Sequence, residues 1–188
     1  LIEESMAAAI GAGLPVFEAT GSMIVDIGGG TCDVAVISLG GIAASRSIKV
    51  GGDAFDEAIV NHMKKAHNLL IGKNTAEDIK LKIGSVSEYD GEGAMDVKGR
   101  NLTDGLPKSV EVTSAEIRDV LAEPVSKIIA SIKETLEVTL PELASDIIDR
   151  GIYLAGGSSQ LRGLPELIAK ETKMQVHIPE KPLDRVAI

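Results

Sequence analysis

Three glycines directly after an aspartate are the feature of this chain that most strongly indicates phosphate chemistry. The segment "DIGGGT" begins at Asp26 and ends at Thr31. Glycines let backbone N–H groups approach a phosphate closely, and a threonine adds a hydroxyl. A carboxylate beside a phosphate is repelled unless a Mg²⁺ ion or its water shell stands between them. We therefore predict that Gly28, Gly29 and Gly30 bind phosphate and that Asp26 holds Mg²⁺ through water.

The residues after the glycines decide which kind of phosphate site this is. A dinucleotide fingerprint continues into a helix, and a Walker A loop contains a lysine. Here "TCDVAVIS" follows, and its alternating β-branched residues predict a second strand. The glycines then form a hairpin turn between antiparallel strands, with Asp33 on the same face as Thr31. The plainer alternative is a glycine turn in which the aspartate is only a turn former, and we favour the phosphate site.

A second glycine segment, "YLAGGSSQLRG", lies near the end of the chain. A strand, the glycines Gly156 and Gly157, and a helix beginning at Ser158 or Ser159 would place helix N–H groups at the strand's carboxyl end. Ligands of α/β sheets collect at this edge. Taken alone, an ordinary strand-to-helix turn is an equal alternative.

Other polar residues have simpler explanations. Glu3 and Glu4 precede an alanine-rich helix, where acids interact favourably with the helix dipole. His62, His67 and His177 have no metal-ligand spacing, so the sequence predicts no metal site for them. The single cysteine, Cys32, is best explained as a small packed residue.

Composition limits the possible partners. The chain has 188 residues, is 44% hydrophobic and carries a net charge of −9, which excludes a basic nucleic-acid footprint. A phosphate ligand must then be held locally, by backbone N–H groups and a metal ion. One cysteine indicates a reducing compartment, and no apolar run approaches the roughly 20 residues of a membrane span. We expect the chain to be a piece of a longer protein.

Periodicity and turn signals predict the elements that position these residues. We expect helices over 5–10, from Asp53 onward, from a capping box at 75–78 to about 86, from a capping box at 113–116 through Leu136, and over "SSQLRGLPELIAKET". Pro124 should kink the fourth of these helices or start a second helix. We expect strands over 22–27, 31–38, 42–50, 94–98 paired with 109–112, "GIYLAGG" and "MQVHIP". An antiparallel hairpin unit joined to α/β crossovers predicts one α/β lobe, with a smaller lobe inserted between about Gly52 and Thr113.

These motifs resemble a known superfamily. "DIGGGTCDVAV" is similar to the second phosphate motif of the actin-like ATPases, whose lobes have a ribonuclease H-like fold. Within it, "LIEESMAAAIGAGLPV", "VGGDAFDEAIV", "TAEDIKLKIGSV", "GLPKSVEVTSAEI", "PELASDIIDRGIYLAGGSSQLRGL" and "PLDRVAI" resemble the bacterial MreB family of rod-shape-determining actins. The likeness covers the whole chain but only the second half of the family's sequence. Residues 1–52 and 114–188 would be like subdomain IIA, and 53–113 like IIB.

The resemblance implies a role for each site residue. Asp26 would be linked to Mg²⁺, and Gly28, Gly29, Gly30 and Thr31 would bind the β- and γ-phosphates of ATP. Glu4 would orient the water that attacks the γ-phosphate, although the residues alone favour a dipole partner. The remaining expected contacts are to the nucleoside: Glu77 and Lys80 to ribose and adenine, and Gly156, Gly157, Ser158 and Ser159 to adenosine.

The resemblance also implies a function for the whole protein. It would bind and hydrolyse ATP, form filaments on the cytoplasmic side of the bacterial inner membrane, and guide the cell-wall elongation machinery. Membrane contact would use the lobe that this chain lacks. The first phosphate motif, D-x-G-T-x-N-T, does not occur here. We therefore expect this chain alone to bind ATP weakly and to hydrolyse it negligibly.

Departures from the family pattern keep alternatives open. Ser5 stands where the family usually has proline, "TCDV" where it has T-T-E-V, and Ser158 where it has a third glycine. The last two are closer to the chaperone ATPases of the same superfamily. A chaperone-type ATPase lobe, a metabolic kinase of the same superfamily and a non-catalytic filament or interaction module are the alternatives.

Overall fold

The computed structural model describes residues 2–178, which divide into two compact units. Among the described residues, unit 1 comprises 2–52, 127–160 and 165–178, and unit 2 comprises 53–126 and 161–164. One boundary falls within the long helix α4 (Ser114–Glu137), after Ser126. The expected boundary lies at the start of that helix, and the assignment of the units to subdomains IIA and IIB stays a prediction. The "PLDRVAI" segment, 182–188, lies outside the described residues.

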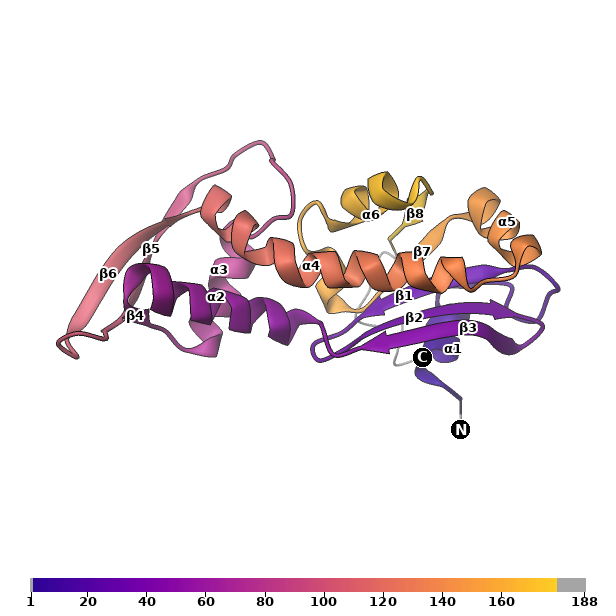
Figure 1. Cartoon of the computed structure of the whole chain (residues 1–188), viewed down its shortest axis with the longest axis horizontal. Helices are drawn as coiled ribbons and strands as arrows, with labels where there is room; N and C mark the ends of the chain where they lie inside the picture. Colours follow the sequence, from indigo (N-terminus) through magenta and orange to yellow (C-terminus); the bar gives the residue numbers. More distant parts are fainter. Residues whose placement is uncertain (1, 179–188) are drawn as a thin grey trace. The chain divides into compact units, whose positions relative to one another are not determined.

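Unit 1 is built on a five-stranded sheet with the order β3-β2-β1-β7-β8 (Figure 1). Its first three strands form an antiparallel meander, whereas β7 runs parallel to β1 and β8 parallel to β7. The strands are β1 (Ser22–Ile27), β2 (Cys32–Ser38), β3 (Gly41–Ile48), β7 (Ile152–Ala155) and β8 (Val176–His177). The helical elements are α1 (Glu4–Gly11), the part of α4 from Lys127, α5 (Pro141–Arg150), the 3₁₀ turn η1 (Gly157–Gln160) and α6 (Leu164–Thr172).

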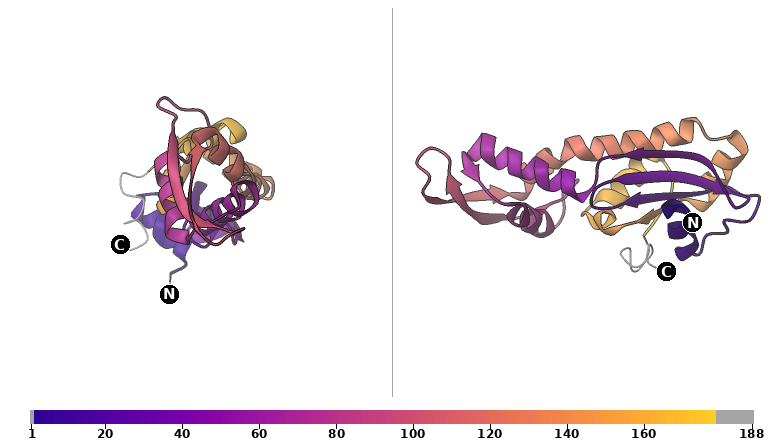
Figure 2. Two further views of the ribbon diagram at one scale, coloured as in Figure 1. Left: turned by 90° about the vertical axis from the view of Figure 1, so that its left-hand side faces the viewer. Right: turned by 90° about the horizontal axis from the view of Figure 1, so that it is seen from below.

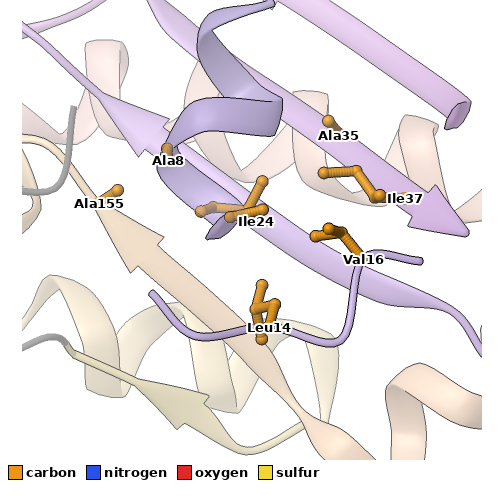
Figure 3. Close-up of a cluster of buried hydrophobic side chains, with 8 residues drawn as sticks. Ala8, Leu14, Val16, Ile24, Ala35, Ile37 and Ala155 are labelled. Atoms are coloured by element: carbon orange, nitrogen blue, oxygen red, sulfur yellow. The ribbon is translucent and has the colours of Figure 1, made fainter. Parts of the chain in front are cut away.

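Both faces of the central strand β1 are covered, and all six of its residues are buried. The right-hand view of Figure 2 shows α1 on one face of the sheet and the unit 1 part of α4 on the other. On the α1 side, a cluster of apolar side chains fills the contact (Figure 3): Ala8, Ala9, Leu14, Val16, Ile24, Ala35, Ile37 and Ala155. The two small alanines let α1 lie close to the sheet. Since strand side chains alternate, Asp26 is on the same face as Ile24.

Unit 2 has a three-stranded antiparallel sheet with the order β4-β5-β6. Its elements are α2 (Gly52–His67), β4 (Leu69–Leu70), α3 (Lys73–Ile83), β5 (Ala94–Asn101), β6 (Pro107–Thr113) and the first part of α4. The apolar stripe expected on α2, with Phe55, Ile59 and Met63, is fully buried. The expected hairpin is confirmed, with Met95 opposite Val112 and Lys98 opposite Ser109.

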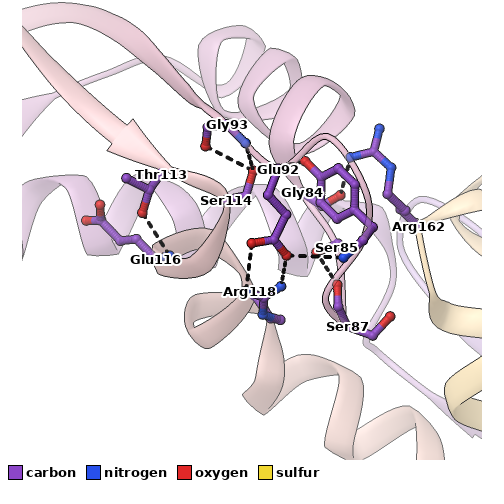
Figure 4. Close-up of polar contacts among 11 residues, drawn as sticks. Gly84, Ser85, Ser87, Glu92, Gly93, Thr113, Ser114, Glu116, Arg118 and Arg162 are labelled. Carbon is purple, nitrogen blue, oxygen red and sulfur yellow. Dashed lines mark hydrogen bonds and ion pairs between the residues drawn. The ribbon is translucent and has the colours of Figure 1, made fainter.

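The connection from α3 to β5 is held by polar contacts (Figure 4). Glu92 forms an ion pair with Arg118 of α4. The Arg162 guanidinium lies 4.1 Å from the centre of the Tyr89 ring, and the Arg162 carbonyl accepts a hydrogen bond from Val86 N at 2.9 Å. These contacts tie residues 161–164 to unit 2 despite their distance in the sequence.

Three helices differ from the sequence expectations. Helix α3 begins at Lys73, because the extended Gly72 acts as its N-cap and Gly72 O accepts the first helical hydrogen bond from Ala76 N. The capping box expected at 75–78 is therefore wrong. Helix α4 runs through Pro124 without a break, so no second helix starts there. Asp53 lies in the first turn of α2, which begins one residue earlier, at Gly52.

The continuous helix expected over "SSQLRGLPELIAKET" is also wrong. The 3₁₀ turn η1 ends at Gln160, and α6 begins at Leu164. Between them Gly163 has φ +82°, and a Cβ there would lie 2.3 Å from Ser87 Oγ, so only glycine fits this bend. The sequence also missed α5 as a separate helix and the short strand β4. Among residues 2–178, no helix is long and apolar enough to cross a bilayer.

Candidate functional site

The glycine segment is a hairpin loop, as predicted. Strands β1 and β2 are antiparallel and pair up to Ile27 opposite Cys32, so residues 28–31 form the connection. The loop is closed by a hydrogen bond from Gly28 N to Thr31 O at 2.9 Å. One pair earlier, Asp26 lies opposite Asp33, which places two carboxylates on one face at the base of the loop.

The chain itself does not require glycine at the tip of this loop. Neither Gly29 nor Gly30 has a positive φ, and a Cβ on either would meet no other atom within 4 Å. A Cβ on Gly28 would meet only Thr31 O, at 3.7 Å. Open space above an exposed backbone is what a ligand needs to contact backbone N–H groups directly. This geometry fits a phosphate.

The loop is fixed from below through one carbonyl. Gly28 O accepts hydrogen bonds from Gly52 N at 3.0 Å and from Ser158 Oγ at 2.9 Å. A Cβ on Gly51 would lie 2.5 Å from the same oxygen, so the backbone passes too close for a side chain. These contacts hold the glycine loop in place without using its outer surface.

Asp26 is a buried carboxylate with an unsatisfied oxygen. The residue is 5% exposed, and within the described residues its Oδ2 has no hydrogen-bond partner. Gly156 lies directly beside it, with φ +82° and a hypothetical Cβ only 2.5 Å from Asp26 Oδ1 and 2.3 Å from Ile27 O. The structure thus brings the two predicted glycine segments together at Asp26. A buried charged oxygen without a partner is unfavourable unless a ligand completes it.

The electrostatics of Asp26 fit a bound cation. Burial, together with the negative charges of Glu4 and Asp33, raises the pKa of Asp26 to about 6. Within the described residues no cationic side chain pairs with Asp26. A Mg²⁺ ion prefers oxygen ligands and would offset this repulsion, so the donor set is suitable for Mg²⁺.

Near the loop, the Thr31 side chain already has a hydrogen-bond partner, and the Cys32 side chain is buried. The Thr31 hydroxyl donates to Asp33 Oδ2 at 2.9 Å, so its predicted contact with phosphate would have to replace or share this bond. Cys32 is fully buried, and burial together with the charges of Asp33 and Asp26 raises its pKa to about 12. The expectation that Cys32 is a packed small residue is confirmed.

The second glycine segment lacks the predicted helix N-terminus. Gly157, Ser158 and Ser159 belong to the short 3₁₀ turn η1, and the buried Ser159 Oγ donates to Gly156 O at 2.6 Å. Ser158 Oγ bonds to the glycine loop, as described above. The Ser158 hydroxyl therefore links the two glycine segments, whereas the Ser159 hydroxyl bonds within its own. The contact of residues 156–159 with adenosine stays a prediction.

The remaining predicted residues lie on two helices. Glu4 is the exposed first residue of α1, and its charge acts on Asp26. Glu77 is exposed on α3 of unit 2. Lys80 Nζ, also on α3, lies 2.7 Å from the buried carboxylate of Asp56, at Oδ1. Because Glu77 and Lys80 belong to unit 2, their contacts with a nucleotide stay a prediction.

One polar cluster was missed by the sequence analysis. In unit 2, His62 Nε2 lies 2.5 Å from Glu116 Oε1, and His67 Nε2 contacts the same oxygen. Burial acts to raise the pKa of Glu116, but the hydrogen bonds and charges of the two histidines together lower it. The spacing of the two histidines did not indicate this cluster, because its third member, Glu116, lies far away in the sequence, within an expected capping box.

Comparison with known proteins places these features in a family. The family profile described as "MreB/Mbl protein" matches residues 1–188. Cell shape-determining protein MreB of Escherichia coli strain K12 is 52% identical over 187 residues, which are 100% of this chain and 54% of that protein. Cell shape-determining protein Mbl of Bacillus subtilis strain 168 is 48% identical over 188 residues, 100% of this chain and 56% of that protein. The chain thus spans about half the length of the curated relatives that it matches.

Solved structures show the same architecture. MreB5 of Spiroplasma citri bound to AMPPNP superposes with a TM-score of 0.94 at 42% identity, over 98% of this chain and 56% of that one. The ADP-bound structure of the same protein gives a TM-score of 0.95, over 99% and 56% of the two chains. The predicted fold class, an actin-like α/β lobe with a smaller inserted α/β part, is confirmed.

Proposed function

The chain belongs to the MreB/Mbl family, and from that premise we propose that it is the nucleotide-binding half of a bacterial actin that binds ATP with Mg²⁺. The family membership removes the support for a chaperone-type lobe. A functional parallel is the MreB5 protein of Spiroplasma citri, whose structures carry AMPPNP and ADP. At 42% identity, that likeness supports a nucleotide as the ligand of this chain.

One observation carries the proposal. The buried Asp26 oxygen without a partner lies at the base of a glycine loop whose tip residues, Gly29 and Gly30, have nothing within 4 Å of a Cβ. Neither feature stabilises the folded chain by itself. An unpaired buried carboxylate is unfavourable, and glycine loses more conformational freedom on folding than alanine does. A phosphate over the loop and a cation at Asp26 would explain both.

In this proposal each site residue has its own role. The N–H groups of the loop bind the β- and γ-phosphates, Asp26 holds Mg²⁺ through water, and Glu4 orients the attacking water. The ion, when bound, neutralises charge on the phosphates during transfer to water. Gly156 and Ser158 keep the loop and Asp26 in register, as their contacts with Asp26 and Gly28 support. Glu77 and Lys80 contact the nucleoside.

The cellular part of the proposal rests on the relatives. The Escherichia coli and Bacillus subtilis proteins are named as cell shape-determining. We propose that the whole protein polymerises with itself, lies on the cytoplasmic face of the inner membrane, and directs peptidoglycan synthesis by the cell-wall elongation machinery. Nucleotide binding would be coupled to this polymerisation.

The direct test is a calorimetric titration of the full-length protein with ATP, with and without Mg²⁺. We expect binding that depends on Mg²⁺ and is lost in Asp26→Ala. Gly29→Ala should weaken binding at least about tenfold, because a methyl group would occupy the space above the loop, yet leave the melting temperature unchanged, because no atom lies within 4 Å. Gly41→Ala is the matched control: it is another exposed glycine of unit 1, whose nearest neighbour to a Cβ is Ser38 O at 3.9 Å.

The outcomes separate the alternatives. If the full-length protein binds no nucleotide, the hairpin has only a structural role, and the alternative of a non-catalytic interaction module is favoured. If Gly29→Ala binds ATP as well as Gly41→Ala does, the phosphate does not lie over this loop. Phosphate transfer to a small molecule instead of water, detected in a coupled assay with sugars, would favour the kinase alternative.

A further inference from the structure

A cluster of two histidines and one glutamate in unit 2 has the composition of a transition-metal site. His62 and His67 lie on α2, and Glu116 lies in the first turn of α4. The ligand-type atoms of the three side chains all lie within 4.8 Å of one another. We propose that His62, His67 and Glu116 bind a divalent transition-metal ion of the zinc type, independently of the nucleotide.

Local structure explains why the two histidines meet although their spacing is unusual. Helix α2 ends at His67, because Asn68 adopts the left-handed conformation with φ +52°. At a helix end the last ring is not held to the regular helical direction, and the two rings stand edge to face with their centres 5.7 Å apart. Both direct Nε2 at one atom, Glu116 Oε1.

Glu116 is available for this role because its backbone and side chain have separate partners. Thr113 Oγ1 accepts a hydrogen bond from Glu116 N at 3.2 Å, which is the first half of the expected capping box (Figure 4). In a complete box the glutamate side chain would return to the backbone of the capping residue. Here the carboxylate contacts the histidines instead.

The three groups suit zinc in number and chemistry. Two imidazole nitrogens and one carboxylate oxygen form a known zinc ligand set, which leaves a fourth position for water. With metal–ligand distances near 2.1 Å, two ligands on a tetrahedral ion lie roughly 3.4 Å apart. The 2.5 Å between His62 Nε2 and Glu116 Oε1 must therefore widen by about 1 Å. The side chains are 23–26% exposed, so small rotations can provide this.

The neighbouring charges have opposite effects. The Glu116 carboxylate attracts a cation, whereas the Lys108 ammonium, which donates to the His67 carbonyl at 3.2 Å, repels one. Imidazole ligands favour zinc, copper or nickel over Mg²⁺, which prefers oxygen. The competing explanation is a hydrogen-bonded trio without an ion.

The test is a calorimetric titration of the 188-residue chain with Zn²⁺, after removal of metals with a chelator and without nucleotide. We expect one ion per chain. His62→Ala and His67→Ala should each weaken binding by at least about 100-fold, since even partners outside the ligand shell are worth 10–100-fold. The control His177→Ala should bind like the unaltered chain, because its ring lies in unit 1 and bonds to Arg150 O at 2.8 Å.

A second measurement needs no variant. Co²⁺ bound to the unaltered chain should give the intense visible absorption of a tetrahedral site, and Zn²⁺ should remove it by displacement. The proposal is overturned if the unaltered chain shows no saturable binding of one Zn²⁺. It is equally overturned if the double variant His62→Ala/His67→Ala, with native circular dichroism, binds Zn²⁺ as tightly as the unaltered chain.

Discussion

At the scale of single residues, Asp26 is ionised at neutral pH against the preference of its surroundings. Its folded-state pKa of about 6 lies above the ordinary value of 3.8 because of burial and the nearby charges of Glu4 and Asp33. As pH rises between these values, the unfolded chain releases its proton first, so the free energy of unfolding falls. Above about pH 6 the full penalty is present, on the order of 3 kcal/mol as an upper bound.

The first prediction follows from this fall in the free energy of unfolding as pH rises. Without Mg²⁺ and nucleotide, Asp26→Asn should have a higher free energy of unfolding than the unaltered chain at pH 7.5, by up to about 3 kcal/mol. The gap should narrow as pH is lowered through 6 toward 4, where the native carboxyl is protonated. Urea unfolding at several pH values measures it. A variant that is less stable at pH 7.5 would show that the ionised carboxylate has partners that stabilise it.

At the scale of elements, α3 is tied to α2 by a buried ion pair. Lys80 Nζ lies 2.7 Å from Asp56 Oδ1, and the two side chains are 13% and 5% exposed. The family resemblance assigns Lys80 to the nucleoside, whereas its contact with Asp56 gives it a structural role. The two roles affect different measurements.

The second prediction separates them on one helix. Lys80→Ala should lower the free energy of unfolding by about 3 kcal/mol, because the buried Asp56 loses the ammonium. Lys82→Ala is the matched control: Lys82 pairs with Asp78 at 2.8 Å, but both side chains are about half exposed, so less than about 0.5 kcal/mol is expected. Urea unfolding measures both. Equal stability of the two variants would remove the structural role, and nucleotide titration of Lys80→Ala in the full-length protein tests the other.

The elements also show what local sequence could predict. The β1–β2 hairpin was predictable, because its alternating β-branched residues and its glycines are neighbours in the chain. The bend at Gly163 was not, because it depends on contact with Ser87. The start of α3 was misplaced because Thr75 and Asp78 match a capping pattern, while the glycine that caps the helix has no side chain to signal it.

The candidate site also contains features that local sequence could predict and features that it could not. Asp26 and the three glycines were found from their own pattern, and Glu4 only through family resemblance. Nothing in the sequence indicated that Ser158 would bond to Gly28, or that Glu116 would meet two histidines, because these partners come from distant segments. Long-range contacts are set by packing, which local patterns do not encode.

At the scale of the whole molecule, the third prediction concerns what this chain can do with only part of the proposed nucleotide site. These 188 residues contain the proposed phosphate loop, and D-x-G-T-x-N-T does not occur among them. Phosphate release from ATP by this chain should stay at background, and ATP should bind at least about tenfold more weakly than to the full-length protein, since fewer groups contact the phosphates. An assay of released phosphate, with the full-length protein beside it, measures this. Equal turnover per mole would mean that the second motif suffices.

The burial of Cys32 has a practical consequence. This cysteine is the only one in the chain, is fully buried, and pairs with Ile27 at the neck of the glycine loop. A thiol reagent can reach it only when the hairpin transiently opens, so the labelling rate of the native chain reports how often that happens. A nucleotide that binds the loop should slow the labelling in proportion to its occupancy. The sulfur atom is thus a built-in reporter, which turns ligand binding at the hairpin into a reaction rate.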